Sequence, residues 1–180
     1  MSSSRLPRPT RRPRLRFPPP RGLWLINELH PHSSHYNVFF SVRLGGPADL
    51  DALRAAVRRV VARHEALRTT FEAVDGVPVQ RIADFVDIPL PVTDLGGLPA
   101  GERAERAGEL AQSWCEQPFE LTAGPLLRTA VFRLEEQDHL LCLALHHIVC
   151  DGQSITVLFE ELAELYAQEC GARPRPPCRS

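Results

Sequence analysis

Residues 126–147 read LLRTAVFRLEEQDHLLCLALHH. The segments 126–134 and 139–147 have the residue pattern of strands, the second of them continuously apolar from Leu140 to Leu145, and the polar EEQD that begins at Glu135 lies between them. This pattern predicts a β-hairpin at the centre of the fold. The second strand is apolar enough to be buried and ends in His146 and His147, so it delivers two titratable side chains to the loop that follows.

The sequence on either side of this hairpin predicts a mixed α/β fold, with a mainly antiparallel sheet and helices packed on it. Asp75-Gly76 is a strong hairpin signal, and apolar residues recur at helical spacing over residues 49–67. Further strands are predicted over residues 36–44, 68–74 and 77–82, an edge strand or loop over 88–92, and helices over 22–29, 49–67, 100–117 and 155–168. Ser154 is predicted to cap the last helix, whose inward-facing residues are Val157, Leu158, Leu162, Leu165 and Tyr166.

The composition is that of one globular domain. The chain has 180 residues, of which 43% are hydrophobic and 24% charged, and this is enough to bury a core. The longest apolar run, Leu140 to Leu145, is too short to cross a membrane, and no signal-peptide core follows the N-terminal arginines. We therefore expect a cytoplasmic protein without a membrane partner. The five cysteines lack C-x-x-C spacing, which disfavours a zinc site and a disulfide framework.

The two ends of the chain differ from the rest in composition. Residues 1–22 carry seven arginines and six prolines, with no acidic residue and little to bury. We expect a disordered Arg/Pro-rich arm over 1–22, one folded unit over 23–171 and a disordered tail over 172–180. A basic arm can also contact nucleic acid, but disorder is the favoured interpretation, and nucleic acid is not an expected partner.

The two histidines cannot both serve one site if the strand continues through His147, because successive side chains point to opposite faces. One histidine then faces a cavity while the other is packed, which argues against a metal bound by both. Asp151 could orient the imidazole or could pair with an arginine to hold the loop, and Gly152 leaves room for a close approach. Ser154 is more typical of a helix cap than of a nucleophile, since the G-x-S-x-G context is absent.

Three ordered segments resemble one known family. HHIVCDG at 146–152 has the H-H-x-x-x-D-G pattern of the condensation domains of nonribosomal peptide synthetases. RHEALRTTF at 63–71 is similar to the family's R-H-E-x-L-R-T-x-F, and PFEL at 118–121 with GPLLR at 124–128 is similar to its P-F-D-L…G-P-L-L-R. The resemblance covers about residues 23–170. It implies a single N-terminal lobe of the chloramphenicol-acetyltransferase-like superfamily.

The resemblance also implies a role for each residue of the site. His147 corresponds to the family's tunnel-facing catalytic histidine, and His146 to its structural partner. The motif aspartate, here Asp151, pairs in the family with an arginine that best matches Arg68, and this pair supports the loop that contains Gly152. A metal is not implied, and no site for a directly bound cofactor is identified.

The implied reaction forms an amide between two thioester-bound substrates. The amine of an aminoacyl acceptor attacks a donor acyl or peptidyl thioester, and phosphopantetheine tethers both substrates to carrier proteins. An α-amino group has a pKa of about 8 and imidazole one of about 6.5, so His147 could accept the proton of the amine. It could equally position the amine and stabilise the intermediate. The expected partners are carrier proteins and a second condensation lobe or adjoining synthetase modules.

Several alternatives stay open at the level of sequence. The H-H motif disfavours heterocyclisation, whereas epimerisation domains share it, and a coenzyme-A-dependent acyltransferase is a weaker third choice. The family's opening segment is matched only by RGLW at 21–24, and the second lobe has no counterpart in this chain. A fragment of a condensation enzyme is therefore the first hypothesis. An inactive remnant or a carrier-protein-binding module is the second.

Overall fold

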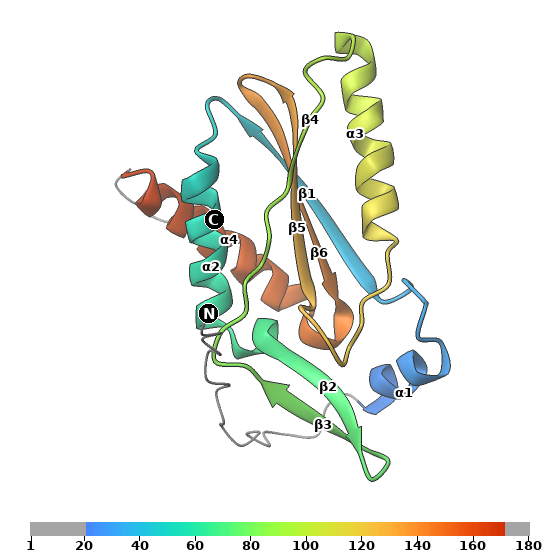
Figure 1. Cartoon of the computed structure of the whole chain (residues 1–180). Coiled ribbons are helices and arrows are strands. Elements are labelled where there is room, and N and C mark those ends of the chain that lie inside the picture. Colours follow the sequence, from blue (N-terminus) through green and yellow to red (C-terminus); the bar gives the residue numbers. More distant parts are fainter. Residues whose placement is uncertain (1–20, 172–180) are drawn as a thin grey trace, which may run out of the picture.

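The computed structural model describes residues 21–171. Within these residues the main sheet has four strands in the order β1-β6-β5-β4, with a central antiparallel hairpin (Figure 1). The strands are β1 Asn37–Gly45, β4 Val92–Asp94, β5 Leu127–Glu135 and β6 Asp138–His146. β6 pairs antiparallel with both β1 and β5, whereas β4 pairs parallel with β5. The hairpin predicted over residues 126–147 therefore forms the centre of the sheet.

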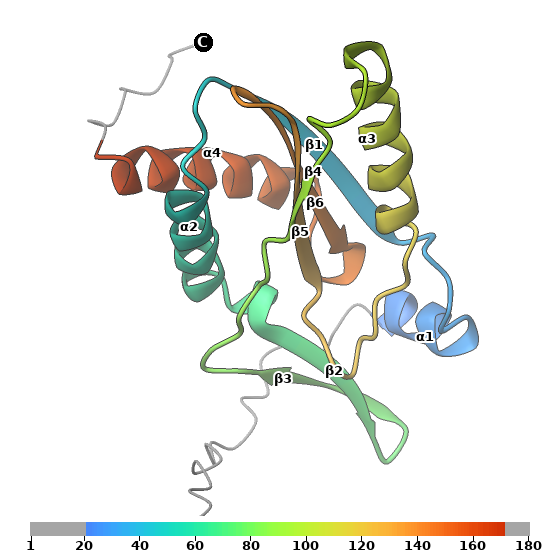
Figure 2. The same ribbon diagram turned by 45° about the horizontal axis from the view of Figure 1, so that its top comes forward.

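Helices cover both faces of this sheet, as Figures 1 and 2 show. The helices α2 Leu50–Arg63 and α4 Gly152–Glu169 lie on one face, and α3 Ala100–Cys115 lies on the other. Alternate residues of β6 separate the two cores: Leu141, Leu143 and Leu145 pack with α2 and α4, whereas Cys142 packs with α3. This alternation is the period-2 pattern of a strand buried on both faces.

A smaller layer lies at the end of the sheet where β6 delivers the histidines. It contains α1 Arg21–Leu29 and the two-stranded antiparallel sheet of β2 Thr69–Val74 and β3 Val77–Ile82. The turn between these strands has Asp75 at φ 52° and Gly76 at φ 76°. Positive φ at both central residues is what a type I′ hairpin requires, and it explains the strength of the Asp-Gly signal. Two short 3-10 helices join neighbouring elements: η1 Glu65–Arg68 lies between α2 and β2, and η2 His147–Val149 lies between β6 and α4.

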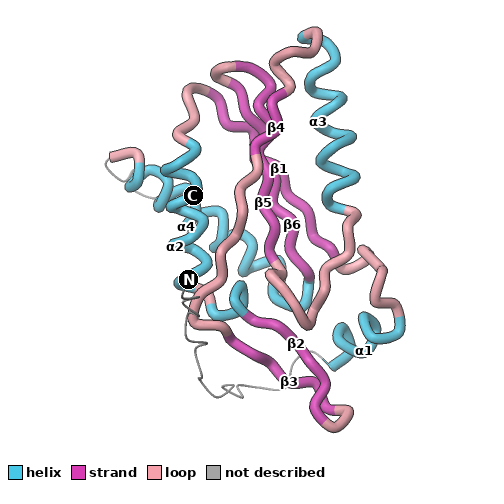
Figure 3. The backbone as a smooth tube through the Cα atoms, viewed as in Figure 1, coloured by secondary structure: helices cyan, strands magenta, loops and turns pink. Residues whose placement is uncertain are grey.

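The segment predicted as an edge strand or loop over residues 88–92 is almost entirely loop, and the short β4 begins at its last residue (Figure 3). The loop follows β5 closely: the carbonyls of Pro89 and Pro91 accept hydrogen bonds from Thr129 and Val131, both of β5. The prolines have no N–H to return, which explains why pairing becomes regular only after them. Because β4 pairs parallel, the sheet is mixed and mainly antiparallel, as predicted.

Other departures from the sequence-based expectations concern the ends of helices. The helix predicted over residues 49–67 ends at Arg63, and η1 follows it. The last helix begins at Gly152, with Asp151 rather than Ser154 as its N-cap. Val157, predicted to face inward, is 44% exposed, whereas Leu158, Leu162 and Leu165 are buried as expected.

The folded unit predicted over residues 23–171 lies within the described residues. The first helix, α1, starts at Arg21, so the last two residues of the predicted arm are helical. The rest of that arm, residues 1–20, and the predicted tail, 172–180, lie outside the described residues. Between residues 21 and 171, no helix combines the length and apolar character that a membrane crossing needs.

Candidate active site

His146 is the last residue of β6 and is a core residue, with 2% of its surface exposed. Its ring lies 6.3 Å from the rings of Tyr36 and Phe119, measured between centroids. Its Nδ1 accepts a hydrogen bond from the backbone N–H of Ile148 at 3.1 Å, so Nε2 carries the proton of the neutral ring. Burial, with a smaller contribution from His147, lowers the pKa of His146 to about 4. His146 is therefore a neutral structural residue.

His147 is exposed, because the strand ends one residue earlier and η2 begins at this position. Its backbone N–H donates to the carbonyl of Tyr36 at 2.8 Å, which anchors the loop to the start of β1. Its Nδ1 lies 2.7 Å from the carbonyl oxygen of Cys150. A carbonyl oxygen only accepts, so Nδ1 must be the donor, and Nε2 of the neutral ring keeps a free lone pair. This geometry makes the exposed Nε2 a potential proton acceptor.

Asp151 contacts the helix that follows it and not the imidazole of His147. Its Oδ1 accepts hydrogen bonds from the N–H of Ser154 at 2.8 Å and from its Oγ at 2.7 Å. The Ser154 Oγ in turn accepts from the Asp151 N–H at 2.7 Å, which completes a capping box at the start of α4. These bonds to Ser154 lower the pKa of Asp151. Asp151 therefore fixes the angle at which α4 leaves the site.

Arg68 is the last residue of η1. Its guanidinium donates to the carbonyls of Val61 at 3.1 Å and Ala62 at 3.3 Å, and also to that of Ala83. The first two carbonyls lie in the last turn of α2, where such groups have no helical partner and a positive charge is favourable. Arg68 thus joins the end of α2 to the segment after β3.

The expected pair between Asp151 and Arg68 is wrong for this structure. Across residues 21–171, the hydrogen bonds of the Asp151 carboxylate go to the first turn of α4, and those of Arg68 go to backbone carbonyls. The physical reason is competition, since the capping box satisfies the carboxylate locally. The residues DGQS at 151–154 contain this cap, but the sequence was interpreted with Ser154, and not Asp151, as the N-cap of the helix.

The space around Gly152 and the grouping of possible metal ligands complete the description of the site. A Cβ placed on Gly152 would meet no atom within 4 Å, so packing among the described residues does not require a glycine there. No cluster of three or more metal-ligating side chains forms in the part of the chain that the structure describes.

Three residues that shape the site were not predicted from the sequence: Tyr36, Phe119 and Cys150. Tyr36 and Phe119 pack around His146, and Cys150 supplies the carbonyl that fixes the ring of His147. Phe119 also lies under the guanidinium of Arg128, 3.8 Å from its ring centroid. The PFEL segment at 118–121, which resembles a family motif, could have indicated that Phe119 is part of the site. A backbone acceptor such as Cys150 leaves no signal in side-chain chemistry.

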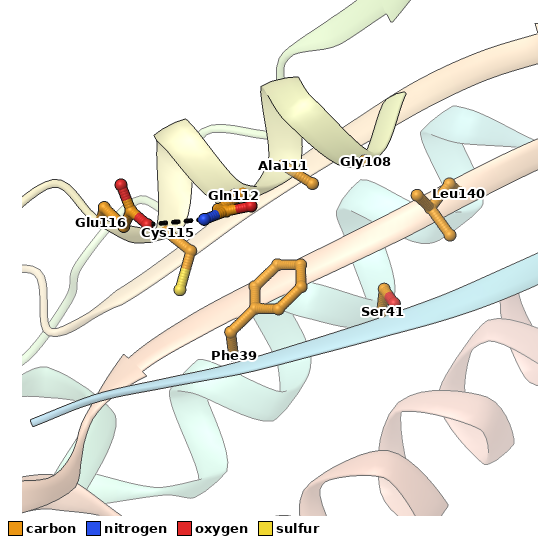
Figure 4. Close-up of a pocket in the computed structure, with 8 residues that line it drawn as sticks. All are labelled: Phe39, Ser41, Gly108, Ala111, Gln112, Cys115, Glu116 and Leu140. Atoms are coloured by element: carbon orange, nitrogen blue, oxygen red, sulfur yellow. Dashed lines mark hydrogen bonds between the residues drawn. The ribbon is translucent and has the colours of Figure 1, made fainter. Parts of the chain in front are cut away.

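A cavity of about 380 Å³ lies on the α3 face of the sheet, away from the exposed loop of His147. Figure 4 shows Phe39, Ala111 and Leu140 pointing into it, with the Cys115 thiol at one end. The hydrogen bond between Gln112 and Glu116, 3.0 Å long, closes the polar side. Burial raises the pKa of Cys115, so its thiol is kept protonated and is a poor nucleophile.

Comparison of the sequence with models of protein families gives a match over most of the chain. The family model described as Condensation domain matches residues 18–179. The chain belongs to the condensation domain family. Solved relatives agree with this: the starter condensation domain of rhizomide synthetase RzmA has a TM-score of 0.78 at 26% identity, over 87% of this chain and 38% of that one. The first condensation domain of the calcium-dependent antibiotic synthetase, solved with a substrate analogue, gives 0.77 at 29% identity, with coverages of 87% and 38%.

Curated relatives of this condensation domain are nonribosomal peptide synthetases. A linear gramicidin synthase of Brevibacillus parabrevis is 44% identical over 144 residues, which are 80% of this chain and 3% of that protein. Phosphinothricin tripeptide synthetase PhsC of Streptomyces viridochromogenes is 45% identical over 150 residues, which are 83% of this chain and 14% of that protein. The chain thus spans a small part of these synthetases and about two fifths of the solved domains.

Proposed function

We propose that this chain contributes the catalytic histidine of an amide-forming condensation in nonribosomal peptide synthesis. The observation that carries the proposal is the hydrogen bond from His147 Nδ1 to the Cys150 carbonyl, 2.7 Å long, in a side chain that is otherwise exposed. This bond orients the ring and leaves the Nε2 lone pair free. Family membership and the synthetase relatives support the reaction class.

In the proposed reaction, the α-amino nitrogen of the acceptor attacks the carbonyl carbon of the donor thioester. A C–N bond forms, and Nε2 of His147 hydrogen-bonds to the amine and accepts its proton. The C–S bond of the tetrahedral intermediate then breaks, and the leaving thiolate takes up a proton to become a thiol. The thioester is already activated, so orienting the amine also contributes to the rate.

The neighbouring residues act through His147 in this proposal. His146 packs the end of β6 and holds the N–H of Ile148, which fixes the first turn of η2. Asp151 sets the start of α4, and Arg68 ties η1 to α2, so both are positioning residues without a substrate contact. Gly152 leaves open space beside the loop, which suits the approach of a substrate.

The substrates and partners are proposed from the same family membership. Donor and acceptor are carried on phosphopantetheine of carrier proteins in the cytoplasm, and the protein binds no further cofactor. Its partners are those carrier proteins together with a second condensation lobe or adjoining synthetase modules. In this proposal the described residues form one side of the substrate site, and the exposed His147 lies at its surface.

The test is a condensation assay with the full 180-residue chain, an acetyl donor and a glycyl acceptor on separate phosphopantetheinylated carriers. Mass spectrometry of the acceptor carrier should detect N-acetylglycyl product with the wild-type chain, and His147→Ala should lower its rate at least about 100-fold. Glu105→Ala is the control, since Glu105 is exposed on α3, which lies on the face of the sheet opposite α4. Carrier binding without product would favour the carrier-protein-binding module. Product formation at equal rates with His147→Ala would refute the catalytic role.

A further inference from the structure

One peptide group, at the start of β1, anchors the backbone of His147. The N–H of His147 donates to the carbonyl oxygen of Tyr36 at 2.8 Å. The N–H of the same peptide group belongs to Asn37 and donates to the carbonyl of Ser34 at 2.9 Å. Because the peptide group is planar, the two bonds together fix its orientation. The position of His147 therefore depends on where the fold places Asn37.

The side chain of Asn37 attaches this peptide group to the end of α3. Its Nδ2 donates to the carbonyl of Cys115 at 2.6 Å and to that of Gln117 at 2.9 Å. Cys115 is the last residue of α3, so its carbonyl has no partner within the helix. The two acceptors lie 78 and 80 residues after Asn37 in the chain. The side chain thus links the start of β1 to a distant element of the fold.

The end of α3 is also fixed independently of Asn37. The guanidinium of Arg128, on β5, donates to the carbonyls of Gln117 at 2.6 Å and Pro118 at 3.1 Å. A positive charge is favourable at the C-terminus of a helix. Loss of the Asn37 side chain should therefore leave α3 in place and release the start of β1.

The contacts determine which way the Asn37 amide points. Nδ2 has two hydrogens and two carbonyl acceptors, and the reversed amide would place Oδ1 against those carbonyl oxygens. As a consequence, Oδ1 is buried and accepts no hydrogen bond from the part of the chain that the structure describes. A buried polar atom without a partner lowers stability and calls for an explanation. The explanation that the contacts offer is the positioning of the peptide group that holds His147.

We propose that Asn37 is a positioning residue for amide formation, which holds the Tyr36 carbonyl and, through it, the backbone of His147. The proposal rests on the proposed function, because that function gives His147 its role. Asn37 touches no substrate in this proposal. The Cys150 carbonyl orients the ring of His147, whereas Asn37 fixes the backbone from which the ring extends. A displacement of about 1 Å at a reacting group can lower a rate about 100-fold.

Hydrogen exchange of the full 180-residue chain, followed by NMR, tests the link without any substrate. Two neighbouring amides give the comparison, because the His147 N–H bonds to Tyr36, whereas the His146 N–H bonds to the Leu126 carbonyl at 3.1 Å. In Asn37→Ala, the loss of two hydrogen bonds should accelerate exchange at His147 at least about tenfold, and at His146 less than about threefold. A general loss of stability would accelerate both amides equally.

The condensation assay then tests whether this position matters for the rate. Asn37→Ala should lower kcat about 10- to 100-fold and leave the KM for the acceptor carrier within about twofold, because the substrate contacts are unchanged. Arg103→Ala is the matched control, since Arg103 Nε donates to the Leu98 carbonyl at 2.8 Å and so secures the opposite end of α3. It should leave both kcat and the exchange of His147 unchanged. If Asn37→Ala does not fold, the milder Asn37→Ser should change the same two readouts in the same direction.

Three outcomes would overturn the positioning role: exchange at His147 that is unchanged or rises equally with that at His146, an unchanged kcat in Asn37→Ala, or an equal loss of kcat in Arg103→Ala. The proposed function fails separately. Absence of product with the wild-type chain contradicts condensation itself, and the exchange rates still decide whether Asn37 holds His147. Product formation at the wild-type kcat in Asn37→Ala contradicts the positioning role alone.

Discussion

The carbonyl oxygen of Cys150 accepts a hydrogen bond from Nδ1 of His147 at 2.7 Å. The acceptor is a backbone group, so the ring is oriented without a carboxylate beside it. One residue earlier the pattern is reversed, because Nδ1 of His146 accepts from the N–H of Ile148. Two adjacent histidines are thus held in opposite ways by the same short helix, η2.

The first prediction concerns their tautomers. When both rings are neutral, His147 should carry its proton on Nδ1 and His146 on Nε2, since a carbonyl only accepts and a backbone N–H only donates. Nitrogen-15 NMR of the imidazoles at pH 8 distinguishes a protonated nitrogen from an unprotonated one. Finding His147 mainly as the Nε2–H tautomer would contradict the free lone pair on which the proposed chemistry depends.

The second prediction is a loss of stability in mild acid that is caused by His146. Its folded pKa of about 4 lies below the ordinary value of 6.5, so the unfolded chain binds the proton more readily. The neutral ring of His146 contributes its full stability to the folded state above pH 6.5, and this contribution is lost as the pH falls towards 4. The expected loss is about 3 kcal/mol in the free energy of unfolding. Urea denaturation at several pH values measures it.

His146→Asn is the control for this measurement. The amide oxygen can accept the Ile148 N–H in place of Nδ1, but the side chain does not titrate. The variant should lose most of the decline in stability between pH 6.5 and pH 4. Equal pH dependence in the wild-type chain and His146→Asn would show that other groups cause the decline.

The third prediction is that Asp151 and Arg68 act independently. Asp151→Ala removes a helix cap and should lower the free energy of unfolding, and Arg68→Ala leaves carbonyls of α2 without a donor and should cost about 1–3 kcal/mol. Their partners differ, so the coupling energy in a double-mutant cycle should be below about 0.5 kcal/mol. A coupling above about 1 kcal/mol would mean that the pair implied by the family forms in solution.

The sequence was most informative where a local pattern has a single physical solution. The alternation of β5 and β6 and the Asp75-Gly76 turn could be predicted because neighbours in sequence determine them. The structure has a packed His146 and an exposed His147, a split that the sequence predicted only if the strand continued through His147. Its cause differs in part, since the strand ends at His146 and a 3-10 turn, not strand alternation, exposes His147.

The remaining features depend on competition between partners that are distant in sequence or belong to the backbone. Residue patterns did not show that Asp151 would cap α4 instead of reaching Arg68, because both contacts satisfy the same carboxylate. The contacts of Asn37 with the end of α3 join residues 78 and 80 positions apart in the chain, so no local pattern indicates them. The carbonyl of Cys150 has no side-chain signature at all.

The most direct test of the central claim compares the wild-type chain with His147→Asn in the condensation assay. The asparagine Nδ2 can replace Nδ1 as the donor to the Cys150 carbonyl, so the loop is preserved, but nothing replaces Nε2. The account predicts an unchanged unfolding midpoint and a rate of amide formation lower by about 100- to 10,000-fold. A folded His147→Asn chain that forms the amide at the wild-type rate would contradict the role of Nε2.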